Sequence, residues 1–169
     1  AQIGKNHLGD RNEYLPTVHG FDEFYGNLYH LNAMEEPYQA DFPKDPEFLS
    51  KFGPRNCLDV VATDVDDPTT DPRWGRVGKQ KITDAGPLPP HPGMDPDAKF
   101  TMEDIDVELA RRSMAFMDRS VKSGMPFFLW HNTTRCHVWT HLSPKWKGKS
   151  GYGLYADAMM ELDSVVGQL

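Results

Sequence analysis

The amino-acid sequence predicts an α/β fold, and three observations support this fold class. Residues 126–130, PFFLW, form a short, continuously apolar run, which suits a strand buried on both faces of a parallel sheet. A helical pattern precedes this run, and a second one follows it after a polar loop over residues 131–152. The order helix, buried strand, long loop, helix is typical of α/β organisation.

The first expected strand is AQIG, residues 1–4, and two polar residues follow it closely. Lys5 and His7 are two positions apart, so their side chains project from the same side wherever the strand direction continues. Lys5 would offer a fixed positive charge, and His7 a titratable donor or acceptor, to one point in space. Gly4 and Gly9 flank the pair and permit close backbone approach. The alternative is a solvated lysine and a surface histidine in a turn.

Residues 35–99 differ in composition from the rest of the chain. They hold eleven of the fourteen prolines, together with many aspartates and few apolar runs. We expect such a Pro-rich loop insertion to be mostly loops and short strands that lie over a surface. Its two candidate strands are LDVVATD, residues 58–64, and RVGKQKIT, residues 76–83.

Two helices are expected in the second half of the chain. Thr101 and Asp104 resemble a capping box, and mostly apolar residues then recur at spacings of three and four. They predict a helix over about 102–122 that ends near Gly124. The second helix is expected over residues 153–169, and it runs apolar to the last residue. This ending and the strand-like start are what we expect of an internal fragment of a longer chain.

Charge and cysteine content exclude several classes of function. The chain has 18 Lys and Arg against 25 Asp and Glu, a formal net charge of −7, which argues against a general binder of nucleic acid or membrane surfaces. No apolar run approaches the roughly 18 residues of a membrane-spanning helix. Cys57 and Cys136 are too few for a disulfide framework and form no C-x-x-C zinc motif. An anionic substrate stays open, because a few converging cations act locally.

A second group of candidate residues lies in WHNTTRCHVWTHL, residues 130–142. It holds three histidines and an arginine: His131, Arg135, His137 and His141. Ligands of an open α/β sheet bind outside the carboxyl ends of its strands, so Lys5, His7 and His137 are expected to face one crevice. Two cations and two histidines there would suit an oxyanion such as sulfate or phosphate. The other two histidines of the segment read as ordinary loop residues.

Cys136 stands next to His137, which raises the alternative of a Cys–His nucleophile. Neighbouring side chains of an extended chain point apart, and this argues against such a pair. GKS at 148–150 is not a P-loop either, because Ser143 stands where the motif needs its first glycine.

AQIGKNHLGD at the start, followed by PTVHGFDEFYG at 16–26, resembles the sulfatase family of the alkaline-phosphatase-like superfamily. That family has a G-K-x-H-x-G segment before an HGFD-x-F-x-G segment at about this distance. PFFLW with its later histidine and residues 153–169 are similar to the family's next strand, active-site histidine and following helix. The resemblance implies that residues 1–169 are the middle portion of one arylsulfatase-like catalytic domain. The expected fold is part of an alkaline-phosphatase-like sandwich, a mostly parallel sheet flanked by helices, incomplete in this chain.

The resemblance also implies roles for individual residues. Lys5 matches the lysine that binds sulfate oxygens. His7 matches the histidine that hydrogen-bonds the nucleophile and helps to break down the covalent intermediate. His137 matches the histidine that contacts sulfate near the leaving-group oxygen. Trp139 stands where the family usually has proline, so His141 stays an alternative substrate-binding residue.

Two cofactors of the family have no counterpart in these residues. The nucleophile of the family is a formylglycine made from Cys or Ser in a C/S-x-P-x-R motif, and neither cysteine lies in such a motif. The aspartates and the asparagine that hold calcium, or a similar divalent cation, are missing as well. We therefore expect no metal ligands in this chain, and no activity from the chain alone.

The complete enzyme implied by the resemblance is a sulfuric ester hydrolase, periplasmic or secreted, that cleaves small sulfate esters to sulfate and an alcohol or phenol. No nucleic-acid partner and no membrane insertion are expected. One alternative is a phosphatase or phosphonate monoester hydrolase of the same superfamily. Another is a non-catalytic, sulfatase-like binding module.

Overall fold

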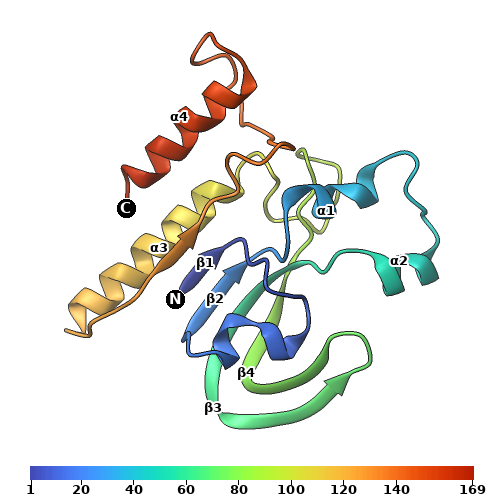
Figure 1. The fold of residues 1–169 in the computed structure, drawn as a ribbon, viewed down its shortest axis with the longest axis vertical. Coiled ribbons are helices and arrows are strands. Elements are labelled where there is room, and N and C mark those ends of the chain that lie inside the picture. The colour runs from blue at the N-terminus through green and yellow to red at the C-terminus, as the bar shows by residue number, and fades with distance from the viewer.

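The computed structural model describes all residues from Ala1 to Leu169, and its centre is a five-stranded sheet with the order β4-β3-β2-β1-β5 (Figure 1). The strands are β1 (Gln2–Gly4), β2 (Glu23–Gly26), β3 (Cys57–Asp71), β4 (Gly75–Gly86) and β5 (Trp130–Asn132). The α/β fold class is therefore confirmed.

The sheet is mixed, which corrects the expectation of a mostly parallel one. β1 pairs in parallel with both β2 and β5, so that Ile3 lies opposite Tyr25 on one side and His131 on the other. β3 is antiparallel to β2 and to β4. The reason is the three-residue connection from β3 to β4, since such a short turn can join only antiparallel neighbours.

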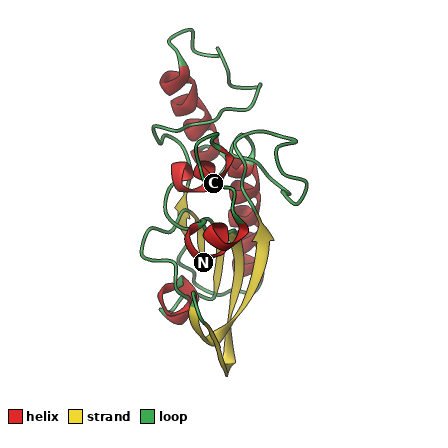
Figure 2. Ribbon diagram, turned by 90° about the vertical axis from the view of Figure 1, so that its right-hand side faces the viewer, coloured by secondary structure: helices red, strands yellow, loops and turns green.

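The Pro-rich segment, expected to be mostly loops and short strands, contributes the two longest strands of the sheet. β3 has 15 residues and β4 has 12, and both extend well beyond the runs expected at 58–64 and 76–83. Figure 2 shows the strands in one layer, with this hairpin reaching past the others at the lower end. The Asp71 carboxylate stabilises the turn by accepting hydrogen bonds of 2.7 Å from the backbone N–H groups of Arg73 and Trp74.

Each face of the sheet has its own apolar core, because successive strand side chains point to opposite faces. On one face the sheet packs against α3 (Ile105–Lys122) through Ile3, Tyr25, Cys57, Ile105, Leu109 and Phe116. The other face packs under two 3-10 helices, Asn12–Tyr14 and Pro16–Val18, through Leu15, Phe24, Leu28, Leu58 and Val60.

The remaining helices are α1 (Leu31–Glu35), α2 (Pro46–Phe52) and α4 (Leu154–Val166), with a 3-10 helix at Glu36–Tyr38. Both long helices lie where the sequence predicts them. The capping contact before α3 is present, because Asp104 accepts from the Thr101 backbone N–H at 2.6 Å. None of the helices combines the length and the apolar character that crossing a membrane requires.

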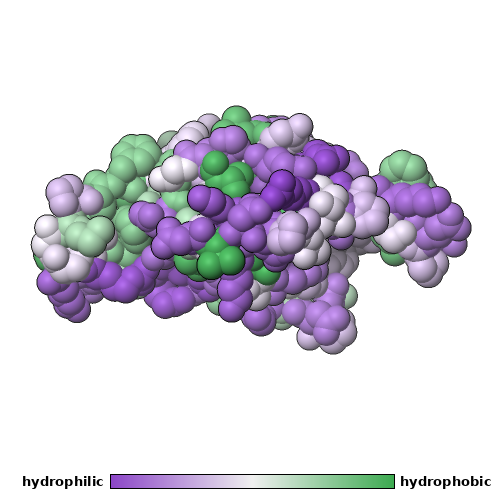
Figure 3. All heavy atoms as spheres, turned by 90° about the horizontal axis from the view of Figure 1, so that it is seen from below, coloured by the Kyte–Doolittle hydropathy of each residue, from purple (hydrophilic) through white to green (hydrophobic).

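The apolar run at 126–130 forms a strand only at its end, and it is not buried on both faces as expected. β5 lies at the edge of the sheet with β1 as its one partner, which leaves Phe128 68% and Trp130 41% exposed. In Figure 3, apolar side chains gather on the left of the face, the side on which α3 ends and β5 begins in Figure 1.

Candidate functional site

The carboxyl ends of the three parallel strands meet at one edge of the sheet and bring four polar side chains together. Lys5 and His7 follow β1, His30 follows β2, and His137 follows β5. The His30 ring lies 5.4 Å from the His7 ring and 5.1 Å from the His137 ring, centroid to centroid. The structure therefore places Lys5, His7 and His137 at one edge of the sheet, although they are separated by up to 132 positions in sequence.

The extended course of the chain beyond β1 sets the direction of the first two side chains. Asn6 continues the parallel pairing through a bridge to Leu28, and its own side chain is buried. Lys5 and His7 stand on either side of Asn6 and therefore project from the opposite face of the extended chain. The Lys5 backbone is held by Asn132, which accepts from its N–H at 3.3 Å and donates from Nδ2 to its carbonyl at 2.9 Å.

Glycines allow the three strand ends to approach this closely. Gly4 has φ +107°, and a Cβ added there would lie 1.7 Å from the Asn132 carbonyl oxygen. A Cβ added at Gly26 would lie 2.0 Å from the Gly4 carbonyl oxygen. Any side chain at either position would force the strands apart, and the residues of the site would then move apart as well.

A cavity of about 200 Å³ at this edge is lined by Lys5, Asn27, His30, Thr133 and His137, among others. A neighbouring cavity of about 470 Å³ shares Lys5 and is also lined by His7 and His131. The Lys5 ammonium forms no ion pair within the chain, and no carboxylate lines either cavity. An unpaired cation beside hydrogen-bonding imidazoles suits an anionic ligand.

Desolvation and the charges of neighbouring groups lower the pKa of two imidazoles of the site, His7 and His137. The pKa of His7 is lowered first by burial and then by the charges of Lys5 and His30. The pKa of His137 is lowered by burial and then by His30, Lys5 and His7. A neutral imidazole offers one donor and one acceptor, so it can both bind an oxyanion and accept a proton.

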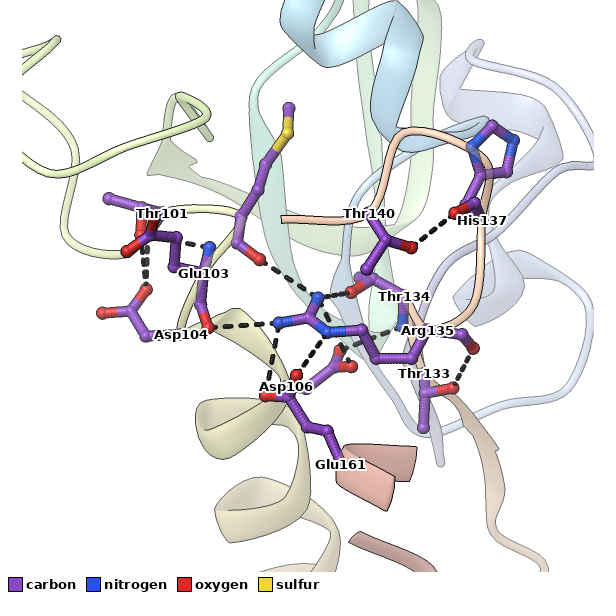
Figure 4. Close-up of polar contacts among 11 residues, drawn as sticks. Thr101, Glu103, Asp104, Asp106, Thr133, Thr134, Arg135, His137, Thr140 and Glu161 are labelled. Atoms are coloured by element: carbon purple, nitrogen blue, oxygen red, sulfur yellow. Dashed lines mark hydrogen bonds and ion pairs between the residues drawn. The ribbon is translucent and has the colours of Figure 1, made fainter. Parts of the chain in front are cut away.

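Arg135 does not supply the second cation expected in the crevice. Its side chain is fully buried and donates from Nε to Glu161 at 2.7 Å, from Nη1 to the Met102 carbonyl and from Nη2 to the Glu103 carbonyl, both at 3.1 Å. Figure 4 shows the guanidinium turned away from His137 and toward α3 and α4. Arg135 thereby holds the loop that contains His137 against Glu161 of α4 and against the start of α3.

The backbone of the same loop is held by Asp106. Its Oδ1 accepts from the Thr134 backbone N–H at 2.9 Å (Figure 4), and its Oδ2 lies 3.8 Å from Arg135 Nη1. Thr140 donates a hydrogen bond to the His137 carbonyl. These contacts fix the position of His137 through its backbone.

The structure does not bring the other two histidines of this segment into the cluster of Lys5, His7, His30 and His137. His141 Nε2 lies 2.8 Å from Glu35 Oε2 on α1, and its ring packs against His91 at 5.0 Å. His131 Nδ1 lies 2.7 Å from Ser113 Oγ on α3, and burial lowers its pKa.

His30 is the residue of the cluster that sequence reasoning missed. The signal that could have found it is positional, because His30 follows a strand, β2, whose carboxyl end lies beside that of β1. No motif marks it, and the parallel pairing of β1 with β2 has to be known first.

Neither cysteine has the surroundings of a nucleophile. Cys57 is buried in the sheet, which raises the pKa of its thiol to about 12. The Cys136 thiol lies 3.3 Å from Met159 Sδ, and burial raises its pKa as well. A reactive thiol needs a lowered pKa, so neither residue fits the role of the reacting group.

The chain also offers no donor set for a divalent cation. No group of three or more His, Cys, Asp or Glu side chains lies close enough together to hold a metal ion. The residues at the strand ends are a lysine and imidazoles without a carboxylate, and calcium prefers carboxylate and carbonyl oxygens. These residues therefore do not fit a calcium site.

A larger cavity, of about 740 Å³, lies at the opposite ends of the parallel strands and is lined by Phe116, Phe127 and Phe128, among others. Arg119 in this cavity is paired with Glu23 at 2.7 Å, so its charge is already compensated. The strand edge with the unpaired Lys5 is the better candidate for anion chemistry.

Comparison with known proteins finds sulfatases that are similar to this chain over nearly its whole length. No protein-family model matches the chain. Arylsulfatase G from Rattus norvegicus is 26% identical over 172 residues, which cover 100% of this chain and 29% of that protein. N-acetylgalactosamine-6-sulfatase from Sus scrofa is 24% identical over 170 residues, 99% of this chain and 25% of that protein.

A solved structure shares the fold. The PsFucS1 sulfatase from Pseudoalteromonas sp. superposes with a TM-score of 0.65 at 27% sequence identity, over 99% of this chain and 30% of that one. The chain thus spans less than a third of the length of the proteins it matches. In sequence and in fold, the chain is similar over nearly its whole length to one part of these sulfatases.

Proposed function

We propose that this chain supplies the anion-binding and proton-handling residues of a sulfuric ester hydrolase of the arylsulfatase type. The observation that carries the proposal is the placement of Lys5, His7 and His137 at the joined ends of β1 and β5. Lys5 lines two neighbouring cavities, one with His7 and one with His137, and neither cavity is lined by a carboxylate. The homology to sulfatases supports sulfate as the anion. In the complete protein these residues would belong to the middle portion of one catalytic domain.

The geometry suggests a division of labour among the three residues. The Lys5 ammonium binds non-bridging oxygens of the ester and compensates the negative charge that they already carry. As the S–O bond breaks, its electron pair goes to the leaving-group oxygen. His137 faces Lys5 across the smaller cavity, where a neutral imidazole can donate a hydrogen bond to the leaving-group oxygen. His7 lines the neighbouring cavity, from which it can hold the proton of the attacking group.

The attacking group itself lies outside these residues. The cysteines do not fit it, and the donor set does not fit a divalent cation, so we expect turnover only from a longer protein that contains this chain. Hydrolysis would then yield sulfate and an alcohol or phenol, with water as the co-reactant.

The decisive experiment replaces Lys5 in the full-length protein. We expect Lys5→Ala to lower kcat/KM for 4-nitrophenyl sulfate by roughly 10²–10³-fold, because a preorganised charge at the developing oxyanion is lost. Lys79→Ala is the matched control, since Lys79 is an exposed lysine on β4 outside both cavities. Near-normal kinetics for Lys5→Ala would refute its role.

The same assay separates the rival functions. Faster turnover of 4-nitrophenyl phosphate or of a phenylphosphonate ester would favour a phosphatase or phosphonate monoester hydrolase. Absence of turnover with all three esters, together with binding of inorganic sulfate, would favour a non-catalytic binding module.

A further inference from the structure

His30 occupies the centre of the histidine cluster. Its ring stacks on that of His137 at an interplanar angle of 21°, and the His7 ring meets it edge-on at 63°. It lines the smaller cavity together with Lys5 and His137. A ligand in that cavity therefore lies against this ring.

The backbone before His30 adopts an unusual conformation to place it there. Tyr29 has φ +65°, in the left-handed region, and is the one non-glycine residue of the chain with positive φ. Its N–H donates to the Asn6 carbonyl at 2.8 Å, and its carbonyl accepts from Asn27 Nδ2 at 3.3 Å. Backbone strain of this kind persists where surrounding contacts enforce it, and it concentrates at functional sites.

The helix that follows fixes the tautomer of the ring. His30 is the N-cap of α1, and its Nδ1 accepts from the Ala33 backbone N–H at 3.4 Å. With Nδ1 as the acceptor, the proton of the neutral ring is on Nε2. Nε2 forms no hydrogen bond within the chain, so its N–H is free to donate to a ligand.

We propose that His30 is a third imidazole of the anion site, whose Nε2–H donates a hydrogen bond to a non-bridging oxygen of the bound sulfate ester. This proposal rests on the function proposed above and extends it. In this arrangement the His30 imidazole donates a hydrogen bond to one non-bridging oxygen. Lys5 makes a separate contact and supplies the positive charge.

The groups around His30 suit an anion, since they include one cation and several hydrogen-bond donors. Lys5 and His7 face it from the chain after β1, and His137 and the Cys136 thiol face it from the loop after β5. Within α1, the Glu35 carboxylate is occupied by His141 at 2.8 Å. A bound sulfate therefore meets donors and a cation, and no opposing carboxylate lines the cavity.

The test uses a variant that keeps the helix cap and removes the ring. Asn is as good an N-cap residue as any, so His30→Asn retains an acceptor for Ala33 N–H while its shorter side chain no longer reaches the cavity. His19→Asn is the matched control, because His19 is exposed and lies away from the cluster. Circular dichroism and the urea midpoint verify that both variants are folded.

The readout is binding of inorganic sulfate to the full-length protein by calorimetry, followed by kinetics with 4-nitrophenyl sulfate. A hydrogen bond to a charged group predicts a loss of about ten- to a hundredfold in sulfate affinity for His30→Asn and an equal rise in KM. The apparent pKa of the remaining histidines in the pH–rate profile should rise, since one repulsive neighbour is gone. Unchanged sulfate affinity in a folded His30→Asn protein overturns the proposal.

The two proposals fail in different ways. If the wild-type protein binds sulfate but hydrolyses no ester, the proposed function fails, and the affinity difference between wild type and His30→Asn still decides the role of His30. If the wild type does not bind sulfate, the anion site itself is refuted, and His30 with it.

Discussion

Lys5 and Arg135 carry the same charge close to the same strand ends, but their surroundings give them different roles. The Lys5 ammonium has no ion-pair partner and lines both cavities of the site. The Arg135 guanidinium is fully buried, and each of its nitrogens has a partner in the protein. We therefore expect Lys5 to contribute to the free energy of ligand binding, and Arg135 to that of folding.

Removing Arg135 should therefore cost stability. Arg135→Met leaves the Glu161 carboxylate buried without its partner, and we expect a loss of about 3–5 kcal/mol in the free energy of unfolding. Urea denaturation of the two single variants and of the double variant Arg135→Met/Glu161→Leu measures the coupling. The double variant should recover much of the loss, because both buried charges are gone. Additive losses would show that the pair is not coupled.

At the scale of elements, β1 has only three residues, as does β5, yet it organises the site. Its three residues pair with β2 and β5 at once, and the glycine at its end lets the backbones touch. The spacing of the strands depends on the missing Cβ atom.

Gly4→Ala tests this dependence, with Gly20→Ala as its matched control. Both glycines have φ near +100°, so both variants bear a similar backbone strain of roughly 1–2 kcal/mol. Only at Gly4 would the new Cβ clash with a backbone, whereas nothing lies within 4 Å of it at Gly20. Urea denaturation should give Gly4→Ala a free energy of unfolding at least about 2 kcal/mol lower than that of Gly20→Ala. We also expect Gly4→Ala to lose sulfate binding. Equal stabilities would mean that the strands separate without cost.

The sequence pattern predicted some of these elements and missed others for physical reasons. α3 and α4 were predictable because local periodicity and a capping contact define them. The far end of β3, residues 65–71, was not, since an Asp- and Pro-rich stretch has low strand propensity and is held by its pairing with β4.

The site divides in the same way. Lys5, His7 and His137 could be proposed from motif spacing and from the rule for strand ends. His30 depends on the strand order and on the left-handed turn at Tyr29, neither of which leaves a local pattern. The buried role of Arg135 follows from the packing of α3 and α4, which no sequence pattern reveals.

At the scale of the whole molecule, three histidines make stability depend on pH. Folding lowers the pKa of His7, His131 and His137 below the ordinary value of 6.5, with burial as the first cause in each. The unfolded chain then binds more protons near this pH, so acid favours unfolding. Stability is full above about 6.5 and falls as the pH drops through that value.

We therefore expect the Tm to fall between pH 7.5 and pH 5.5, as measured by differential scanning fluorimetry. The carboxylates with lowered pKa, such as Glu108 and Asp157, stay ionised over this range and do not contribute. His131→Asn removes one of the three groups, and its Tm should depend less on pH. An identical pH dependence in this variant would assign the effect to other groups.

The parallel pairing of β1 with β5 has a consequence for how the molecule folds. Gln2 lies opposite Trp130, so the pairing closes a loop of more than 120 residues. Contacts between such distant residues form late and slowly, whereas the turns of α3 form within microseconds. The hairpin and the helices can be complete while Lys5 and His137 are still apart. We therefore expect the histidine cluster to report the last stage of folding, and binding of an anion there to favour only the finished chain.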